Sequence, residues 1–354
     1  MKKKILLCIL SCWLCLQCVG LAGCVGETEK YSKYSFDYFD TVTTVTGYAK
    51  SQEEFDSVAD DALEELAEYH KLFTIYHRYD GMENLCTVNE AVEGERRTVT
   101  VDERIIDMLL YAKEMYETTD GTVNIAMGSV LSLWHEYRQE GLDDPQAAKL
   151  PPMEKLEAAA EHTDMNGLVI DEEACTVTLT DPAMKLDVGA IAKGYAVEMV
   201  AQSLEEQGVT GYVLNVGGNV RTIGTKGDGA KWLVGIENPD EDSEEAYLAY
   251  LELAGESLVT SGSYQRYYVV DGKRYHHIID PVTLMPSEGY VSVSVVCDSS
   301  ADGDALSTAL LCMDLETGMS FVEELPDTEA MWVLPDGTKQ ESSGFAEYKK
   351  ETVN

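Results

Sequence analysis

The chain has 354 residues, and its 26 lysines and arginines against 64 aspartates and glutamates give a formal net charge of −38. This charge excludes a general nucleic-acid binder, because the field of the protein repels phosphate backbones. With 45% hydrophobic and 25% charged residues, the composition excludes both a largely disordered chain and a polytopic membrane protein. Any anionic ligand must be held by local devices such as a metal ion or backbone N–H groups.

The first residues have the layout of a secretory signal. Three lysines at positions 2–4 precede an apolar run at 5–21. The run ends in Leu-Ala-Gly-Cys, which resembles the lipobox of bacterial lipoproteins, so we expect cleavage after residue 23 and a lipid on Cys24. The alternative is an uncleaved anchor, since the run is nearly long enough to span a bilayer. In both cases we expect the folded part outside the cytoplasm, held at the bacterial cell membrane.

Residues 24–36 are expected to be the lipidated cysteine and a polar tether, followed by one catalytic domain at 37–350. A strand-like alternation at 39–49 and a helix-like period at 52–69 open this domain. The same patterns predict strands at 177–179, 211–216, 231–236, 247–253, 257–261, 266–270 and 291–296, and helices at 101–117, 193–207, 302–313 and 315–325. We predict an α+β fold of mixed, largely antiparallel sheets with packed helices.

Four cysteines remain beyond the signal and Cys24, namely Cys86, Cys175, Cys297 and Cys312. None has the spacing of metal ligands, and an even number outside the cytoplasm permits disulfides. Cys297 lies in a strand pattern and Cys312 in a helix pattern, where buried free thiols are equally expected. The sequence therefore assigns no disulfide.

Two glycine-containing segments could bring backbone N–H groups to a phosphate. KLDVGAIAKGYAV at 185–197 predicts a strand end, a tight turn with Gly189, and a helix start where Lys193 adds a positive charge. NVGGN at 215–219 follows a strand, and its paired glycines would let a ligand approach the main chain. Taken alone, each segment is equally explained by an ordinary turn.

A third segment, RYHHIIDP at 274–281, places two histidines near a carboxylate. If this segment is a strand, His276 and His277 face opposite sides, so the two cannot readily bind one ion. This argues against a zinc site and for one histidine acting alone, as a general base or a phosphate contact.

A fourth segment, ADGDALSTA at 301–309, begins a predicted helix with Asp304 and Thr308 four residues apart. Their oxygens would share one helical face, and hard oxygen ligands suit Mg²⁺ better than zinc. A carboxylate in a first helical turn is also explained by compensation of the helix dipole.

Taken in order, LDVGAIAKGYA, NVGGN, VTSGSYQRYY, RYHHIIDP and ADGDALSTALL resemble the ApbE family of FAD:protein FMN transferases, over about residues 39–325. The resemblance implies a Mg²⁺-dependent enzyme that uses FAD as substrate, transfers its FMN half to a Ser or Thr hydroxyl of a target protein, and releases AMP. The target would be an extracytoplasmic electron-transfer protein that carries a flavinylation motif.

The family pattern also implies roles for single residues of this sequence. Mg²⁺ would be held by Asp304, Thr308 and the backbone carbonyl of Ala190. His277 would accept the proton of the incoming hydroxyl or help position the phosphate. The remaining residues would contact FAD, namely Lys193, Asn215, Gly218, Ser261 and Asp280.

One stretch departs from the pattern of the family. DGTVNIAMG at 120–128 has Asn124 and Ala126 where many members carry Asp and Thr. A second metal site is therefore not expected there.

Two other functions are compatible with the same residues. An FAD pyrophosphatase would use water in place of the protein hydroxyl and release FMN and AMP. A non-catalytic lipoprotein would only bind FAD, and the combined presence of Asp304, Thr308 and His277 argues against it. The sequence does not separate the transferase from the pyrophosphatase, because the nucleophile comes from outside in both.

Overall fold

The computed structural model describes residues 28–93, 98–240 and 242–350, and its main feature is an antiparallel sheet of eight strands in the order β1-β2-β6-β7-β10-β13-β14-β15. The pairing registers are continuous, for example Thr43 opposite Val216 in β2 and β6 and Ser261 opposite Val293 in β10 and β13. The strands are β1 (Glu29–Tyr38), β2 (Thr41–Ala49), β6 (Tyr212–Val216), β7 (Asn219–Ile223), β10 (Ser257–Gly262), β13 (Ser292–Cys297), β14 (Glu329–Val333) and β15 (Lys339–Glu341).

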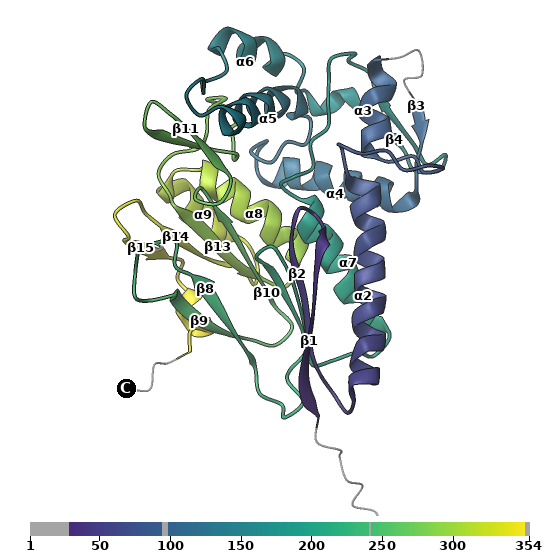
Figure 1. Cartoon of the computed structure of the whole chain (residues 1–354), viewed down its shortest axis with the longest axis vertical. Coiled ribbons are helices and arrows are strands. Elements are labelled where there is room, and N and C mark those ends of the chain that lie inside the picture. Colours follow the sequence, from purple (N-terminus) through teal and green to yellow (C-terminus); the bar gives the residue numbers. More distant parts are fainter. Residues whose placement is uncertain (1–27, 94–97, 241, 351–354) are drawn as a thin grey trace, which may run out of the picture.

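Helices α2, α7 and α8 pack on one face of this sheet (Figure 1). α2 begins where the Ser51 hydroxyl accepts a hydrogen bond from the Glu54 N–H at 3.2 Å, which satisfies one free donor of the first turn. Its apolar stripe, which includes Phe55 and Leu66, is fully buried against the sheet. The helices are α2 (Gln52–Phe73), α3 (Leu85–Glu93), α4 (Glu103–Thr118), α5 (Gly128–Asp143), α6 (Met153–Ala160), α7 (Ala192–Glu206), α8 (Ser300–Cys312) and α9 (Leu315–Glu324).

The other elements close the remaining sides of the sheet and of its helices. The hairpin of β8 and β9 buries Ile236 and Leu251 with Leu258 of the sheet and Phe345 of η2. The hairpin of β11 and β12 packs Tyr268 against α5. These elements are β3 (Thr98–Thr100), η1 (Met165–Gly167), β4 (Leu168–Asp171), β5 (Thr176–Leu179), β8 (Trp232–Glu237), β9 (Tyr247–Leu253), β11 (Tyr267–Val270), β12 (Lys273–His276) and η2 (Phe345–Tyr348).

The predicted α+β class with largely antiparallel sheets is confirmed, and the described residues form a single domain. The strands and helices predicted over the ranges given above are present, with ends that differ by a few residues, but the strand expected to end at Asp187 is reduced to an isolated bridge at Lys185. The four cysteines are free, with Cys297 in β13 and Cys312 at the end of α8. Among the described residues, no helix combines the length and the apolar character needed to cross a bilayer.

The tether predicted at residues 24–36 is wrong from residue 29 onward. Glu29–Tyr38 forms edge strand β1, which pairs with β2 from Glu29 opposite Ala49 to Tyr38 opposite Thr41. The sequence resembles a tether because an edge strand with one solvent-facing side can carry just as many polar residues. The strand is nevertheless packed on the domain, since the Tyr31 ring stacks on Phe55 of α2 with 5.6 Å between the ring centroids. Residues 24–27 of the predicted tether, Cys24 included, lie outside the described residues, as does the predicted signal at 1–23.

Candidate functional site

One cavity brings together six of the residues predicted to act on the substrate or metal. It lies between α5, the first turns of α7, the end of β10, the segment after β12, and α8. The predicted residues that line it are Ala190, Lys193, Ser261, His277, Asp304 and Thr308. Segments separated by more than a hundred residues in the sequence therefore converge on one site.

Asp304 is held in the cavity wall by two donors from α7. Its side chain is 6% exposed, and its Oδ1 accepts a hydrogen bond from Lys193 Nζ at 2.9 Å. Its Oδ2 accepts a hydrogen bond from the Gly194 N–H at 2.8 Å. A carboxylate has about four lone-pair positions, so two donors leave room for a further partner on the cavity side.

Thr308 follows one helical turn later on α8, as the spacing predicted. Its Oγ1 donates to the Asp304 carbonyl at 3.1 Å and lies 3.4 Å from Ser261 Oγ. The helix start is fixed by the Ser299 hydroxyl, which accepts from the Asp302 N–H at 3.3 Å. Asp304 and Thr308 thus present oxygens to the same cavity, next to Ala190.

Gly194 allows this arrangement, because α7 and α8 touch at its Cα. A Cβ at this position would overlap with the Ser300 carbonyl oxygen and with the Asp304 Cβ. The sequence indicated a glycine turn at this helix start, whereas the structure places Gly194 inside the first turn of α7. Glycine is therefore needed at position 194 because two helices come close together there, and not because the chain turns.

Lys193 contributes a cation to a chain with a large excess of acidic residues. Its Nζ donates both to Asp304 and to Asn219 Oδ1, at the start of β7. Asn219 is fully buried, and its Nδ2 has no hydrogen-bond partner within the described part of the chain.

The two adjacent histidines have different surroundings. β12 ends at His276, so the strand assumed for residues 275–280 is wrong beyond that point. The buried His276 donates from Nε2 to the Ser287 carbonyl at 2.8 Å and accepts from the Ile278 N–H at Nδ1, which fixes the loop. His277 lies past the strand end and lines the cavity, where its Nδ1 is buried and unpartnered among residues 28–93, 98–240 and 242–350.

His277 is held as a neutral imidazole. Loss of water around the ring lowers its pKa from 6.5 to about 3, and the positive charges of Arg266 and Arg138 act in the same direction. A hydrogen bond with the Arg266 backbone opposes the shift without offsetting it. A neutral imidazole with an unpartnered nitrogen can accept a proton, but a pKa of about 3 lies well below the pH of about 7 at which a general base works best.

Arg138 and Arg266 were not predicted as site residues. Both line the cavity, with Arg138 on α5 and Arg266 before β11. Arg266 stands in the quoted segment VTSGSYQRYY, and a search of that segment for cations would have found it. Arg138 carries no local motif, because its place in the site depends on how α5 packs on the rest of the domain.

Asp187, the predicted strand end, is also a cavity residue. Its Oδ1 accepts the Gly189 N–H at 2.9 Å, which shapes the turn that leads to Ala190. Burial raises the pKa of Asp187, and the neighbouring Gly189 N–H, His135 and Arg138 act against that rise.

Three predicted FAD contacts lie away from this cavity. Asn215 and Gly218 line a neighbouring groove between the sheet and the β8–β9 hairpin, which adjoins the cavity at Gly217. Gly217 and Gly218 form a two-residue hairpin turn with φ of 55° and 92°, a conformation that glycine adopts without strain. The Asp280 carboxylate accepts the Val282 N–H at 2.7 Å, and this residue is not part of the cavity wall.

Asn124 replaces the usual carboxylate for a visible structural reason. Its Nδ2 donates to the Thr163 carbonyl at 2.9 Å, and its Oδ1 accepts from the Ala126 N–H at 2.8 Å. A carboxylate could make only the second of these bonds, because it has no N–H to donate. Asn124 therefore has a role in holding the cavity wall.

The donors in the cavity fit a hard divalent cation. Within the described ranges, no group of three or more His, Cys, Asp or Glu side chains gathers as a ligand set. The cavity wall at α8 instead offers the Asp304 carboxylate and the Thr308 hydroxyl, with Ala190 of the turn before α7 lining the same cavity. Oxygen donors of this kind suit Mg²⁺, which keeps several waters and shares its coordination with phosphate oxygens.

Comparison with known proteins places these features in a family. The model of the ApbE family matches residues 39–332. The FAD:protein FMN transferase of Klebsiella pneumoniae is 34% identical over 272 residues, which is 74% of this chain and 81% of the relative. The enzyme of the same name from Treponema pallidum is 32% identical over 259 residues, 70% of each chain.

Solved structures agree with the sequence relatives. The ApbE protein of Thermotoga maritima superposes with a TM-score of 0.77 at 29% identity, covering 91% of this chain and 100% of that one. The flavin transferase ApbE of Vibrio cholerae gives a TM-score of 0.73 at 25% identity, covering 91% and 99%.

The neutral state of His277 is open to a direct measurement. We expect its ring proton resonances in the ligand-free folded chain to stay unchanged between pH 8 and 5, because the folded-state pKa of about 3 lies below this range. The denatured chain is the control, and its histidines should titrate near their usual value of about 6.5. A His277 titration midpoint near 6 in the folded chain would contradict the desolvated environment.

Proposed function

The chain belongs to the ApbE family, and on that premise we propose that it transfers the FMN moiety of FAD to a Ser or Thr hydroxyl of another protein in a Mg²⁺-dependent reaction. Its relatives carry the name of this transfer, FAD:protein FMN transferase, and the chain is an enzyme of that class. The observation that supports the proposal most is the convergence of Asp304, Thr308, Lys193 and His277 on one cavity.

The charges of the cavity suit a pyrophosphate. The whole chain carries a formal charge of −38, which opposes the approach of an anion. Lys193, Arg138 and Arg266 line the cavity and supply local positive charge there. Tyr76, whose side chain is exposed, adds aromatic surface on which a flavin or adenine ring can stack.

The proposed Mg²⁺ would be held by Asp304, Thr308 and the Ala190 carbonyl, where it would neutralise pyrophosphate charge and polarise the bond that breaks. Lys193 stands beside Asp304 and would contact the same phosphates. The Lys193 ammonium pairs with the Asp304 carboxylate at 2.9 Å, which offsets part of the cost of burying that carboxylate.

His277 is the proposed proton acceptor. The hydroxyl oxygen of the target would form a bond to the phosphorus of the FMN half, the bond from that phosphorus to the bridging oxygen would break, and AMP would leave with the electron pair. The hydroxyl proton would move to the free Nδ1 of His277, which is neutral and unpartnered among the described residues.

The central test is mass spectrometry of a Ser/Thr acceptor domain incubated with the chain, FAD and Mg²⁺. We expect the acceptor to gain the mass of FMN minus water, with one AMP released per modified acceptor. Asp304→Asn should lose this transfer, because the neutral amide removes the ion's only carboxylate within the proposed set. Asp302→Asn is the matched control, since Asp302 bonds Tyr111 at 3.0 Å outside the cavity wall.

The same experiment separates the alternatives. AMP and free FMN with an unmodified acceptor would indicate a pyrophosphatase, and binding of FAD without AMP would indicate a non-catalytic flavin protein. Full transfer by Asp304→Asn would remove Asp304 from the mechanism.

His277→Ala should slow transfer by about 10² to 10⁴-fold, which is the usual contribution of a positioned general base. Its affinity for FAD should change little, because the ring faces the incoming hydroxyl in this proposal. Single-turnover rates and flavin fluorescence titrations measure the two quantities. Equal losses in rate and in affinity would make His277 a binding residue instead.

We also propose that the enzyme is lipid-anchored through Cys24 on the outer side of the bacterial cell membrane. Support comes from the lipobox-like LAGC at 21–24 and from the apolar run before it. Incorporation of an alkyne-palmitate label should be lost in Cys24→Ser, while an unprocessed chain that begins at Met1 would identify an uncleaved anchor. Retained label in the variant would exclude Cys24 as the acylated residue.

A further inference from the structure

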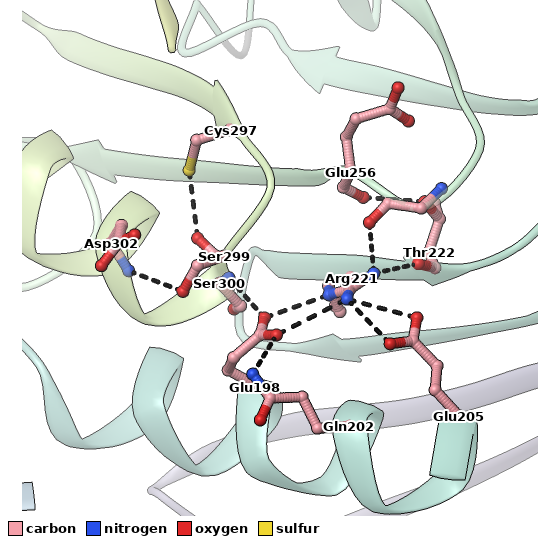
Figure 2. A network of polar contacts seen from close by, with 11 residues as sticks. Glu198, Gln202, Glu205, Arg221, Thr222, Glu256, Cys297, Ser299, Ser300 and Asp302 are labelled. Atoms are coloured by element: carbon pink, nitrogen blue, oxygen red, sulfur yellow. Dashed lines mark hydrogen bonds and ion pairs between the residues drawn. The ribbon is translucent and has the colours of Figure 1, made fainter. Parts of the chain in front are cut away.

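A buried ion pair joins α7 to strand β7 of the sheet (Figure 2). The Arg221 side chain on β7 is 7% exposed, and its Nε donates to Glu198 Oε2 of α7 at 3.0 Å. Its Nη1 donates to the carbonyls of Thr222 and Gly255, and its Nη2 lies 3.2 Å from Glu205. This guanidinium is thus fully used, and it fixes the position of the Glu198 carboxylate.

Glu198 also contacts the first residue of α8. Its Oε2 accepts the Ser300 N–H at 2.8 Å, and its side chain is only 5% exposed. The first N–H groups of a helix have no partner within the helix, and a carboxylate at this end is further favoured by the helix dipole. The Glu198 side chain of α7 therefore caps the N-terminus of the neighbouring helix α8.

Two bonds of this kind join α7 to α8, one turn apart. Gly194 and Glu198 are four residues apart on α7, and their partners Asp304 and Ser300 are four residues apart on α8. One turn of helix rises about 5.4 Å, so a shift of α8 along α7 would break both bonds together. Because Gly194 has no Cβ, the backbones of α7 and α8 lie close enough for both hydrogen bonds to form.

We propose that Glu198 is a positioning residue for the metal site and that Arg221 holds it in place. The pair sets α8 against α7, and it therefore sets the distance between the Asp304 and Thr308 oxygens on α8 and the Ala190 carbonyl before α7. Neither residue lines the cavity, so neither contacts the substrate. The inference rests on the proposed function, because it takes these three residues as the Mg²⁺ ligands.

The test is Glu198→Gln, with Mg²⁺ affinity of the full-length chain measured by calorimetry and as the Mg²⁺ concentration for half-maximal transfer. Gln keeps the size of the side chain but leaves the Arg221 charge without its closest partner. We expect a loss of about 10- to 100-fold in Mg²⁺ affinity, the usual effect of changing residues that orient metal ligands. FAD affinity in the presence of a chelator should change less than about 2-fold.

Glu205→Gln is the matched control. It removes a carboxylate from the same helix and the same guanidinium, but Glu205 is 39% exposed and has no bond to α8. It should leave Mg²⁺ affinity unchanged. Equal effects of the two variants, or none from Glu198→Gln, would overturn the positioning role and leave only a contribution to stability.

A second variant covers the case in which Glu198→Gln does not fold. Ser300→Pro removes the N–H that Glu198 accepts, together with a buried hydroxyl that has no partner among the described residues, and proline is well tolerated at the first residue of a helix after an extended residue such as Ser299. It should weaken Mg²⁺ binding in the same direction, and unchanged binding in a folded Ser300→Pro chain would overturn the proposal. Asp304→Asn separates failure of the proposed function from failure of the positioning role. If this variant retains Mg²⁺ binding, the metal assignment itself is wrong. If it loses Mg²⁺ binding while Glu198→Gln binds Mg²⁺ normally, only the positioning role is rejected.

Discussion

The contact between α7 and α8 is the constraint on which the site depends. The two helices meet at a glycine, and backbone-to-carboxylate bonds from Gly194 to Asp304 and from Ser300 to Glu198 join them one turn apart. Because α7 carries Lys193 and follows the turn with Ala190, and α8 carries Asp304 and Thr308, this contact decides whether the ligand groups lie together. Both helices pack on the same face of the large sheet (Figure 1), which resists their separation.

The cavity is lined by positively charged side chains, although the molecule as a whole is strongly negative. The chain has a formal charge of −38, yet Lys193, Arg138 and Arg266 surround the position of the reacting groups. Burial of the ring is the main cause of the lowered pKa of His277, and the two arginines that would attract a pyrophosphate act in the same direction. Arg221 and Glu198 form a second buried pair, in which burial of either group alone would be strongly destabilising.

Much of the fold followed from local pattern. Alternation in β2 and β9 and the helical period of α2 are visible in the sequence because one side of each element faces a core and the other does not. Strand β1 was taken for a tether because its exposed edge is rich in polar residues, and only its pairing with β2 distinguishes it. Strand β7 was missed because NVRTI mixes polar and apolar residues although all five are buried. There Arg221 pairs with Glu198 and the Asn219 side-chain carbonyl oxygen accepts from Lys193, and no local pattern displays these partners on α7.

The sequence by itself determined the family, the fold class and the chemical types at the site, because motifs such as AIAKG, HHIIDP and DALST are local and carry their residues with them. It also determined that Asp304 and Thr308 share a helical face, since that follows from helical geometry alone. Only the tertiary structure decided which histidine keeps an unpartnered nitrogen, because the Ser287 carbonyl and the Ile278 N–H take both ring nitrogens of His276, whereas His277 Nδ1 has no partner among the described residues. Only the packing of α5 brings Arg138 to the site, and only the approach of α8 to α7 gives Glu198 its partner, because these contacts join residues that are distant in the chain.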